Sequence, residues 1–397
     1  MNNSFICLDL GASNTRYCED NGIIHWLPNN ISVIDQNTET NLDAWGDDNV
    51  EERIRSNLDI TIEKVSGTSD YFPVRVLVGK MAERYRAVAE RPNSMMHKHK
   101  QRVNYISAIA ATAVSRLNVV MSGGKVESDA LYMYVALPPV EIDIAKGYMS
   151  EQLVGEYKVT FNKLDSLTVN FRVLGVKCME ESYSALTTFF FENGKLRPNA
   201  VKYARGYVLS LDIGASTTDI VAVKDMKFLE RTGKTLKIGG NSVTDTVIEE
   251  VQKRDGYELN HEDAELAVAE GRVRHGMAFS DISEIVINAK KAFASSIIAS
   301  LQTYFINIKI PIQSFSAIVV SGGGSMKGEY TDESGQLVET SKPISDYITE
   351  QIQSICNTVA VEYIDDAPRL ANVKGLFTKA IYDKKKRESV AAQNLMN

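Results

Sequence analysis

The chain has 397 residues, enough for two domains, because single domains usually contain roughly 100–200 residues. Apolar residues make up 44% and charged residues 24%, a globular composition that excludes wholesale disorder. The 44 Lys and Arg against 51 Asp and Glu give a net charge of −7. Direct nucleic-acid binding is therefore not expected, since it depends on dense positive charge.

The ends of the chain and its cysteines indicate a cytoplasmic protein that does not contact membranes. Strand-like sequence begins at Phe5, which leaves no room for a signal peptide, and no apolar run approaches the roughly 20 residues that span a bilayer. The charged run 384–388 lacks the bulky apolar face of a membrane-surface helix. The four cysteines show no metal-binding spacing, so reduced thiols rather than a structural zinc are expected.

The first predicted element is a buried strand at residues 5–8, which leads into a polar turn. The turn reads Asp-Leu-Gly-Ala-Ser-Asn-Thr over residues 9–15. Further along, the polar and acidic stretch 35–70 predicts a small outer subdomain at about 35–75. The acidic run Asp43–Glu52 and the basic run His97–Arg102 are typical of solvated loops. In a self-assembling protein they would instead meet across a subunit contact and set its register.

The turn recurs about half a chain later. Residues 212–218 read Asp-Ile-Gly-Ala-Ser-Thr-Thr, which is identical to residues 9–15 at five of seven positions, with an offset of 203 residues. The second copy follows an apolar run at 207–211 and precedes the β-branched strand 220–223. The sequence therefore predicts the same β-hairpin twice, once in each of two duplicated lobes.

The chemistry of this hairpin suits a phosphate chain. Gly11 and Gly214 allow a tight turn and close approach of a ligand, and successive backbone N–H groups can hold phosphate oxygens. Asp9 and Asp212, at the strand ends, can hold Mg²⁺ through water, because Mg²⁺ keeps much of its hydration shell. Two such hairpins would face each other and grip the phosphates. The predicted phosphate-binding residues are Gly11, Ala12, Ser13, Asn14, Thr15, Gly214, Ala215, Ser216, Thr217 and Thr218.

A third glycine-rich turn follows the predicted buried strand 315–320. Its sequence, Ser321-Gly-Gly-Gly-Ser325, permits close backbone approach to a nucleoside. A dinucleotide-binding G-x-G-x-x-G motif is excluded because Lys occupies position 327. A Walker A motif, G-x-x-x-x-G-K-[ST], is excluded as well, because Phe228 occupies the position of the first Gly before the Gly-Lys-Thr run at 233–235.

Together these motifs resemble the actin-type ATPase fold shared by actin, sugar kinases and heat-shock chaperone ATPases. Residues 6–17 resemble its first phosphate motif, 208–223 its second and 317–326 its adenosine motif. Residues 180–185 and 369–375 resemble its two connecting motifs. The resemblance implies a duplicated two-lobe α/β fold, ribonuclease-H-like in each lobe, with nucleotide in the interlobe cleft.

Within that superfamily, the chain is most similar to bacterial plasmid-segregation actins of the ParM type. The similarity rests on four short runs: Leu27-Pro-Asn29, Val78–Ala82, Glu181-Ser182 and Ala371–Gly375. One departure is Glu180, which occupies the position of a family Pro. By resemblance, lobe I comprises 1–182 with a returning helix at 370–397. Lobe II comprises 183–369 with an outer subdomain at about 245–290, and 327–341 is expected to be a surface loop.

The resemblance also assigns roles to individual residues. Glu181 would orient the attacking water, with Glu180 as its rival, and Asp219 is a further candidate for the outer shell of the metal. The cofactors implied are Mg²⁺ and ATP, with GTP as the alternative nucleotide. Lys290 and Lys291 lie on a helix where the family places a residue against adenine, and Lys291 is the one chosen. The predicted nucleoside-binding residues are Gly239, Gly240, Asn241, Lys291, Gly322, Gly323, Gly324 and Ser325.

The expected function is a filament-forming ATPase that moves plasmid DNA during segregation. Its partners would be further copies of itself and a DNA-binding adaptor at a plasmid centromere, with no direct contact to nucleic acid. The alternatives are a small-molecule kinase on the same fold and another cytoskeletal bacterial actin. A chaperone ATPase would need a large substrate domain after the second connecting motif, and none follows in this sequence.

Overall fold

A computed structural model describes residues 4–40, 54, 58–85, 89–93, 96–121, 130–164, 166–192, 194–276, 278–332, 334–364 and 367–396. The acidic run Asp43–Glu52 lies outside them. The chain divides into two compact units, residues 1–184 with 372–397, and residues 185–371. The expected lobe boundaries, after residues 182 and 369, lie close to these divisions. Among the described residues, no helix is both long and apolar enough to cross a membrane.

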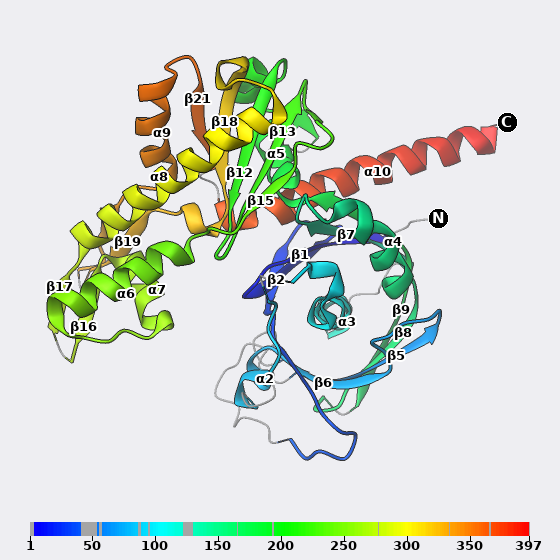
Figure 1. Cartoon of the computed structure of the whole chain (residues 1–397). Coiled ribbons are helices and arrows are strands. Elements are labelled where there is room, and N and C mark those ends of the chain that lie inside the picture. Colours follow the sequence, from blue (N-terminus) through cyan, green and yellow to red (C-terminus); the bar gives the residue numbers. More distant parts are fainter. Residues whose placement is uncertain are drawn as a thin grey trace. The chain divides into compact units, whose positions relative to one another are not determined.

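The first unit is built on one nine-stranded sheet, in the order β3-β2-β1-β7-β9-β8-β5-β6-β4 (Figure 1). Its central strands β1, β7 and β9 are parallel, and the other neighbours pair antiparallel. The strands are β1 (Ser4–Leu10), β2 (Asn14–Glu19), β3 (Ile24–Pro28), β4 (Ile31–Val33), β5 (Leu58–Ser66), β6 (Val74–Val78), β7 (Ala130–Leu137), β8 (Gly155–Phe161) and β9 (Leu167–Glu180).

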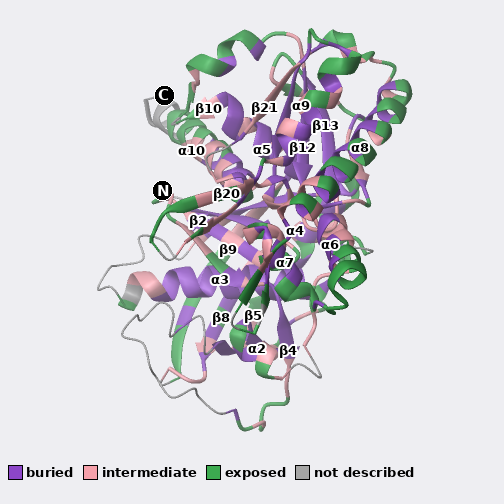
Figure 2. Cartoon of the chain, turned by 90° about the vertical axis from the view of Figure 1, so that its left-hand side faces the viewer, coloured by how far each residue is buried: buried purple, intermediate pink, exposed green. Residues whose placement is uncertain are grey.

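Helices cover both faces of this sheet. They are α2 (Lys80–Arg84), α3 (Arg102–Met121), α4 (Ile142–Leu153) and α10 (Ala371–Met396). A further helix, α5 (Glu181–Phe190), follows β9 directly and continues into the second unit, which begins at residue 185. The sheet curves around α3, which is buried along most of its length (Figures 1 and 2). Successive side chains of β1 point to opposite faces: Ile6 joins the core with Ile109 of α3, whereas the Phe5 ring lies 5.8 Å from that of Phe377 on α10. β1 is therefore apolar on both sides.

The predicted outer subdomain at about 35–75 is not separate in its described part. β5 and β6 from this stretch pair with each other, and β5 pairs with β8, within the nine-stranded sheet. The acidic composition of the stretch concealed a strand with alternating apolar positions, Leu58, Ile60 and Ile62, all of which are buried. Burial of this apolar face places the strand in the main sheet.

The two connecting segments that resemble the family motifs approach each other at Ser184 and Gly375, both of which lie in this unit. A Cβ atom on Gly375 of α10 would lie 1.8 Å from the carbonyl oxygen of Ser184 on α5, so no side chain fits there. The Ser184 hydroxyl in turn donates to the carbonyl of Asn372 at 2.8 Å. A glycine at position 375 is what allows the two helices to approach this closely.

The second unit repeats the same strand plan on a smaller sheet, ordered β14-β13-β12-β18-β21, with β15 added against β13. β12, β18 and β21 are parallel, and β12 and β13 form an antiparallel hairpin. The strands of this sheet are β12 (Tyr207–Ile213), β13 (Thr218–Lys224), β14 (Lys227–Phe228), β15 (Lys234–Leu236), β18 (Phe315–Ser321) and β21 (Ala360–Tyr363).

The helices of the second unit bury the apolar side chains of this sheet, including Leu209, Ile318 and Val320. They are α6 (Asn241–Asp255), α7 (His261–Glu270), α8 (Ser283–Ile308) and α9 (Ile344–Ile355). Three two-stranded sheets complete the described strands: β10 (Phe191–Glu192) with β11 (Lys195–Leu196), β16 (Arg272–His275) with β17 (Ala278–Asp281), and β19 (Gly328–Thr331) with β20 (Leu337–Ser341).

The segment 327–341, expected to be a surface loop, forms the β19–β20 hairpin. Its polar sequence gave no apolar alternation, because both strands are largely solvent-exposed or half-buried. The turn between them is supplied by Asp332, whose carboxylate accepts the backbone N–H groups of Ser334 and Gln336 at 2.9 Å each. Turn chemistry, rather than hydrophobic patterning, defines this hairpin.

Candidate functional site

The first hairpin turn is closed by one short backbone hydrogen bond. The N–H of Gly11 donates to the carbonyl of Asn14 at 3.1 Å, and a Cβ on Gly11 would lie 2.8 Å from that carbonyl oxygen. Ala12 and Ser13, at the tip, are exposed. Thr15, the second residue of β2, is fully buried. Its hydroxyl therefore lies inside the unit, and the predicted contact of Thr15 with a phosphate stays a prediction.

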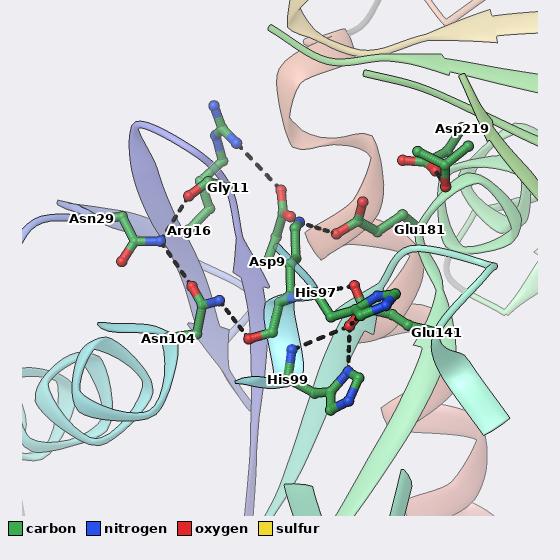
Figure 3. A network of polar contacts seen from close by, with 12 residues as sticks. Asp9, Gly11, Arg16, Asn29, His97, His99, Asn104, Glu141, Glu181 and Asp219 are labelled. Atoms are coloured by element: carbon green, nitrogen blue, oxygen red, sulfur yellow. Dashed lines mark hydrogen bonds and ion pairs between the residues drawn. The ribbon is translucent and has the colours of Figure 1, made fainter. Parts of the chain in front are cut away.

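Asp9 lies at the carboxyl end of β1, opposite Arg16 in the register of the hairpin. The Asp9 side chain is buried, and its carboxylate forms an ion pair with the Arg16 guanidinium at 3.3 Å (Figure 3). A buried carboxylate is stable only with such a partner or with hydrogen bonds. The first hairpin thus carries its own cation next to the predicted metal ligand.

A chain of amide hydrogen bonds connects this turn to the basic run at residues 97–100. Asn29 donates its side-chain amide to the carbonyl of Gly11 at 2.7 Å and contacts Asn104 at 3.4 Å. Asn104 donates to the carbonyl of Lys98 at 2.8 Å (Figure 3). The Ser107 hydroxyl donates to the Asn29 amide oxygen at 2.7 Å. The positions of the turn and of Lys98 are therefore coupled through buried side chains.

Glu181 and Glu180 have different surroundings. Glu181 begins α5, is buried, and forms a close ion pair with the Lys98 ammonium. Glu180 ends β9, and its charged neighbours are Lys146 and Asp143 of α4; burial raises the pKa of this carboxyl. Consecutive residues at the strand-to-helix junction thus point to different sets of partners.

The register of the sheet brings Asp9 and Glu181 to the same edge. Asp9 pairs with Ala136 of β7, and Ala136 pairs with Met179 of β9, two residues before Glu181. The carboxyl ends of parallel strands form the usual ligand-binding edge of an α/β sheet. The first unit therefore gathers a strand-end carboxylate, an exposed glycine turn and Glu181 at this edge.

The second hairpin repeats the turn of the first. The N–H of Gly214 donates to the carbonyl of Thr217 at 2.8 Å, the counterpart of the bond between Gly11 and Asn14. Ala215, Ser216 and Thr217 are half-buried. The hydroxyl of Thr218 donates to the carbonyl of Ile238 at 2.8 Å, which stabilises the fold locally.

Two carboxylates face each other across this hairpin. Asp212 pairs with Asp219 in the register of β12 and β13, and both side chains are buried. The hydroxyl of Thr235 donates to the Asp219 carboxylate at 2.5 Å. On the other side, Asp212 pairs with Ser321 of β18, whose hydroxyl lies 3.5 Å from the Asp212 carboxylate. Asp219, the outer-shell candidate, therefore lies directly across from the predicted metal ligand.

Glycines from three segments pack around the second turn. The N–H of Gly240 donates to the carbonyl of Gly214 at 2.9 Å. A Cβ on Gly239 would lie 2.6 Å from the Ala215 carbonyl oxygen, and one on Gly324 would lie 2.6 Å from that of Gly214. Asn241 begins α6, and its N–H donates to the carbonyl of Ala215 at 2.7 Å. The predicted phosphate and nucleoside glycines of this unit thus form one cluster.

Gly322 fits where no other residue would. Its φ of 92° lies in the region that L-residues avoid, and a Cβ there would lie 2.5 Å from the Asp212 carboxylate. Gly323 packs on the side chain of Arg369, and the Ser325 hydroxyl donates to the carbonyl of Gly322 at 2.6 Å. The Gly322–Ser325 turn is therefore folded directly against the strand-end carboxylate.

Lys290, rather than Lys291, contacts the segment that follows this glycine run. The buried ammonium of Lys290 donates to the carbonyl of Met326 at 2.9 Å and to the hydroxyl of Ser341 at 2.8 Å. Burial lowers the pKa of Lys290 to about 8. Lys291 is exposed and lines a surface pocket with Glu339 and Tyr347. The helix turns by about 100° per residue, so adjacent lysines face different surroundings.

Sequence reasoning missed three participants in the network of the first unit: Lys98, Asn104 and Glu141. Lys98 belongs to a basic run that reads as a solvated loop, and its partner Glu181 is 83 residues away. Asn104 lies on α3, where Ser107 and Thr112 are buried as well, so no pattern in the sequence distinguishes its amide from these other polar side chains. Glu141 precedes α4 and gives no such signal in the sequence.

Comparison with known proteins identifies the fold. Residues 210–329 match the family model described as archaeal actin homologue MreB-like, C-terminal. The chain is similar to the solved actin-like protein Alp7A, with 17% identity, 98% of each chain covered and a TM-score of 0.71. Comparison with curated proteins gives no match.

Two ParM structures also resemble the chain. One is a 15-stranded ParM filament from Clostridium botulinum, 20% identical, with 96% of this chain and 100% of that one covered and a TM-score of 0.61. The other is Bacillus thuringiensis ParM with ATP, 13% identical, with 97% and 100% covered and a TM-score of 0.63. The chain therefore has the fold of actin homologues, as the sequence predicted.

Proposed function

We propose that the protein is an actin-like ATPase that polymerises into nucleotide-dependent filaments and moves plasmid DNA during segregation. The observation that carries this proposal is the repeated hairpin, with a strand-end Asp and a glycine turn closed by the same backbone hydrogen bond in both units. A single copy is an ordinary turn. Two copies, each at the carboxyl end of a central parallel strand, support a phosphate-binding function.

The residues of the second unit fit a nucleotide with Mg²⁺. Asp212 and Asp219 supply two buried carboxylates, and hard oxygen ligands of this kind suit Mg²⁺. Gly239, Gly322 and Gly324 pack so closely on the second turn and its strand that a Cβ at any of them would collide with backbone atoms. When bound, Mg²⁺ neutralises charge on the phosphates during phosphoryl transfer. GTP is the alternative nucleotide, because glycine packing alone does not select the base.

Glu181 is the best candidate for orienting the attacking water. It begins α5 at the same sheet edge as Asp9, and its carboxylate is held by Lys98 rather than by solvent. Glu180 is directed to α4 and is less suited to the role. Hydrolysis of the γ-phosphate requires positioning and charge stabilisation more than covalent chemistry, so a held carboxylate suits the positioning of the water.

Filament formation is supported by the ParM filament among the similar structures, and plasmid segregation by the resemblance to actins of that type. The net charge of −7 favours attachment to DNA through a separate basic adaptor. A cytoplasmic location accords with this role. The alternatives are another cytoskeletal bacterial actin and a small-molecule kinase. The first has the same assembly behaviour without a DNA adaptor, and the second does not assemble.

Sedimentation and negative-stain microscopy test this proposal. The protein at micromolar concentration is expected to pellet as filaments with Mg-ATP and to stay in the supernatant without nucleotide. Parallel samples with Mg-GTP establish which nucleotide is used. Hydrolysis without any pelleted material, with either nucleotide, would reject the filament and favour the kinase.

A further inference from the structure

Three side chains beside the predicted catalytic carboxylate form a cluster that nucleotide hydrolysis does not use. His97, His99 and Glu141 place one potential metal-ligand atom each within 4.8 Å of one another (Figure 3). The two histidines flank Lys98 in a short 3-10 turn, and Glu141 precedes α4. Two imidazoles and one carboxylate are the ligand set of many three-ligand zinc sites.

The atoms are close to the geometry that a metal requires. His99 Nδ1 lies 2.5 Å from Glu141 Oε2, and His97 Nδ1 lies 3.9 Å from the same oxygen. With metal–ligand distances of about 2.0–2.2 Å, atoms of a tetrahedral site lie roughly 3.3 Å apart. Coordination therefore requires His99 Nδ1 to move away from the Glu141 oxygen and His97 Nδ1 to move toward it. A metal ion would then replace the hydrogen bond between His99 and Glu141.

The backbone that carries these ligands is already held in place. The Glu141 carboxylate accepts the N–H groups of Lys98 and His99, at 3.0 and 3.2 Å. The hydroxyl of Tyr105 donates to the carbonyl of His99 at 2.5 Å, and Asn104 donates to that of Lys98. Ligands fixed by outer hydrogen bonds lose less entropy when the ion binds.

The cluster of His97, His99 and Glu141 is buried except on one side. His99 and Glu141 are almost completely buried, whereas the side chain of His97 is 54% exposed. An ion can therefore enter from the solvent side of His97, and water can complete its coordination. Imidazole nitrogen selects zinc, nickel or copper rather than Mg²⁺, so this site would not compete for the metal of the nucleotide.

We propose that His97, His99 and Glu141 form a binding site for a divalent transition-metal ion of the zinc class, and that the bound ion fixes Lys98 against Glu181. Lys98 lies between the two histidine ligands, and its ammonium pairs with Glu181. The second half of the proposal rests on the proposed function, because it assigns a regulatory effect to a residue beside the hydrolytic carboxylate. The site itself requires no nucleotide.

Cobalt absorption spectroscopy tests the site on the full-length, tag-free protein without nucleotide. Co²⁺ is expected to bind with a stoichiometry of one and to give intense visible bands of low-coordinate cobalt, which Zn²⁺ then removes. Absence of a stoichiometric cobalt signal in the folded protein overturns the proposal, whatever its ATPase activity.

His97→Ala is the informative variant, since an exposed side chain is removed and the fold should remain intact. The loss of one of three ligands is expected to weaken Zn²⁺ affinity beyond the roughly 10–100-fold that loss of an outer partner costs. His261→Ala is the matched control: His261 is 46% exposed and lies 3.4 Å from the Glu265 carboxylate. Unchanged affinity in His97→Ala, or an equal loss in His261→Ala, overturns the site.

The regulatory half is measured by nucleotide turnover at saturating Mg-ATP, with and without one equivalent of Zn²⁺. Zinc is expected to change the rate for wild type and for His261→Ala and to leave His97→Ala unaffected. If zinc binds to the wild-type protein but does not change its turnover rate, the coupling through Lys98 is contradicted. A protein without any turnover would reject the proposed function while the cobalt result still decides the site.

Discussion

The two hairpins share a turn but differ at the residue opposite the strand-end Asp. In the first unit, Asp9 faces Arg16 and pairs with it at 3.3 Å. At the equivalent position of the second unit, Asp212 faces another acid, Asp219. Both turns have the same backbone hydrogen bond, from the N–H of the Gly to the carbonyl of the third residue after it. The residue opposite the strand-end Asp, however, is positively charged in the first hairpin and negatively charged in the second.

The difference indicates a division of roles between the two turns. A carboxylate paired with arginine already has its charge balanced, whereas two buried carboxylates side by side favour an added cation. We therefore expect Asp212 to be the main anchor of Mg²⁺ and Asp9 to contribute mainly to the position of the first turn. Substitutions at the two sites should then have unequal effects.

The largest effect is expected for Asp212→Asn. Without this carboxylate, Mg²⁺-dependent turnover should fall below detection in a protein that remains folded by circular dichroism, because the metal loses its anchor. Asp9→Asn, the matched substitution in the first hairpin, should retain turnover reduced by about 10²-fold. Steady-state rates measured over a range of Mg²⁺ concentrations distinguish the two. Equal losses would remove the proposed division of roles.

Glu181→Gln should have the next largest effect. The amide keeps the shape of the side chain but cannot orient water as the carboxylate does, so turnover should slow by roughly 10²–10⁴-fold. Nucleotide affinity should remain within a few-fold of wild type in a titration with a fluorescent ATP analogue. Glu180→Gln is the control and should retain near-normal turnover. The opposite pattern would transfer the catalytic role to Glu180.

A stability effect is expected where α5 and α10 cross. Gly375→Ala would place a Cβ 1.8 Å from the Ser184 carbonyl oxygen, and the forced shift should lower the free energy of unfolding by about 3 kcal/mol. Gly147→Ala is the control, because Gly147 lies within α4 and a Cβ added there would meet no atom within 4 Å. That substitution should stabilise by about 0.5–1 kcal/mol. Urea unfolding of both variants measures the contrast, and similar changes would contradict it.

The smallest effect concerns the buried cation of the second unit, Lys290, whose pKa is lowered to about 8 from 10.5 by burial. Between these two values the folded protein has lost the proton that the unfolded chain still holds, so stability rises with pH. Relative to Lys290→Met, wild type should gain about 1 kcal/mol between pH 7.5 and pH 9. Urea unfolding at both pH values measures this. A difference that stays constant would show that Lys290 keeps its ordinary pKa.

Much of the fold was predictable because duplication left a signal in the sequence. Asp9 to Thr15 and Asp212 to Thr218 identified both hairpins without any structural knowledge. The close-packed turn at the glycine run 322–324 was predictable for a physical reason. The positive φ of Gly322 and its close approach to Asp212 exclude a residue with a side chain at this position. Turns that require glycine are visible in a sequence in a way that most contacts are not.

Most of the contacts that the sequence did not predict join residues that are distant along the chain. The pairing of Lys98 with Glu181 and of His99 with Glu141 joins segments more than 40 residues apart, and no local pattern predicts it. Helix phase separates Lys290, which is buried and bonded to Met326, from the exposed Lys291, whose predicted contact with the nucleoside stays a prediction. The inward hydroxyls of Thr15 and Thr218 followed from strand alternation, which the turn motif concealed.

The most direct test of the account is a light-scattering time course after Mg-ATP is added to wild type and to Glu181→Gln. If hydrolysis dismantles the filaments, scattering should rise for both proteins and then decay for wild type. The Glu181→Gln signal should persist, because slower hydrolysis leaves the filament in its ATP-bound state. No rise for either protein would contradict assembly, and equal decay in both would contradict the role of Glu181 in hydrolysis.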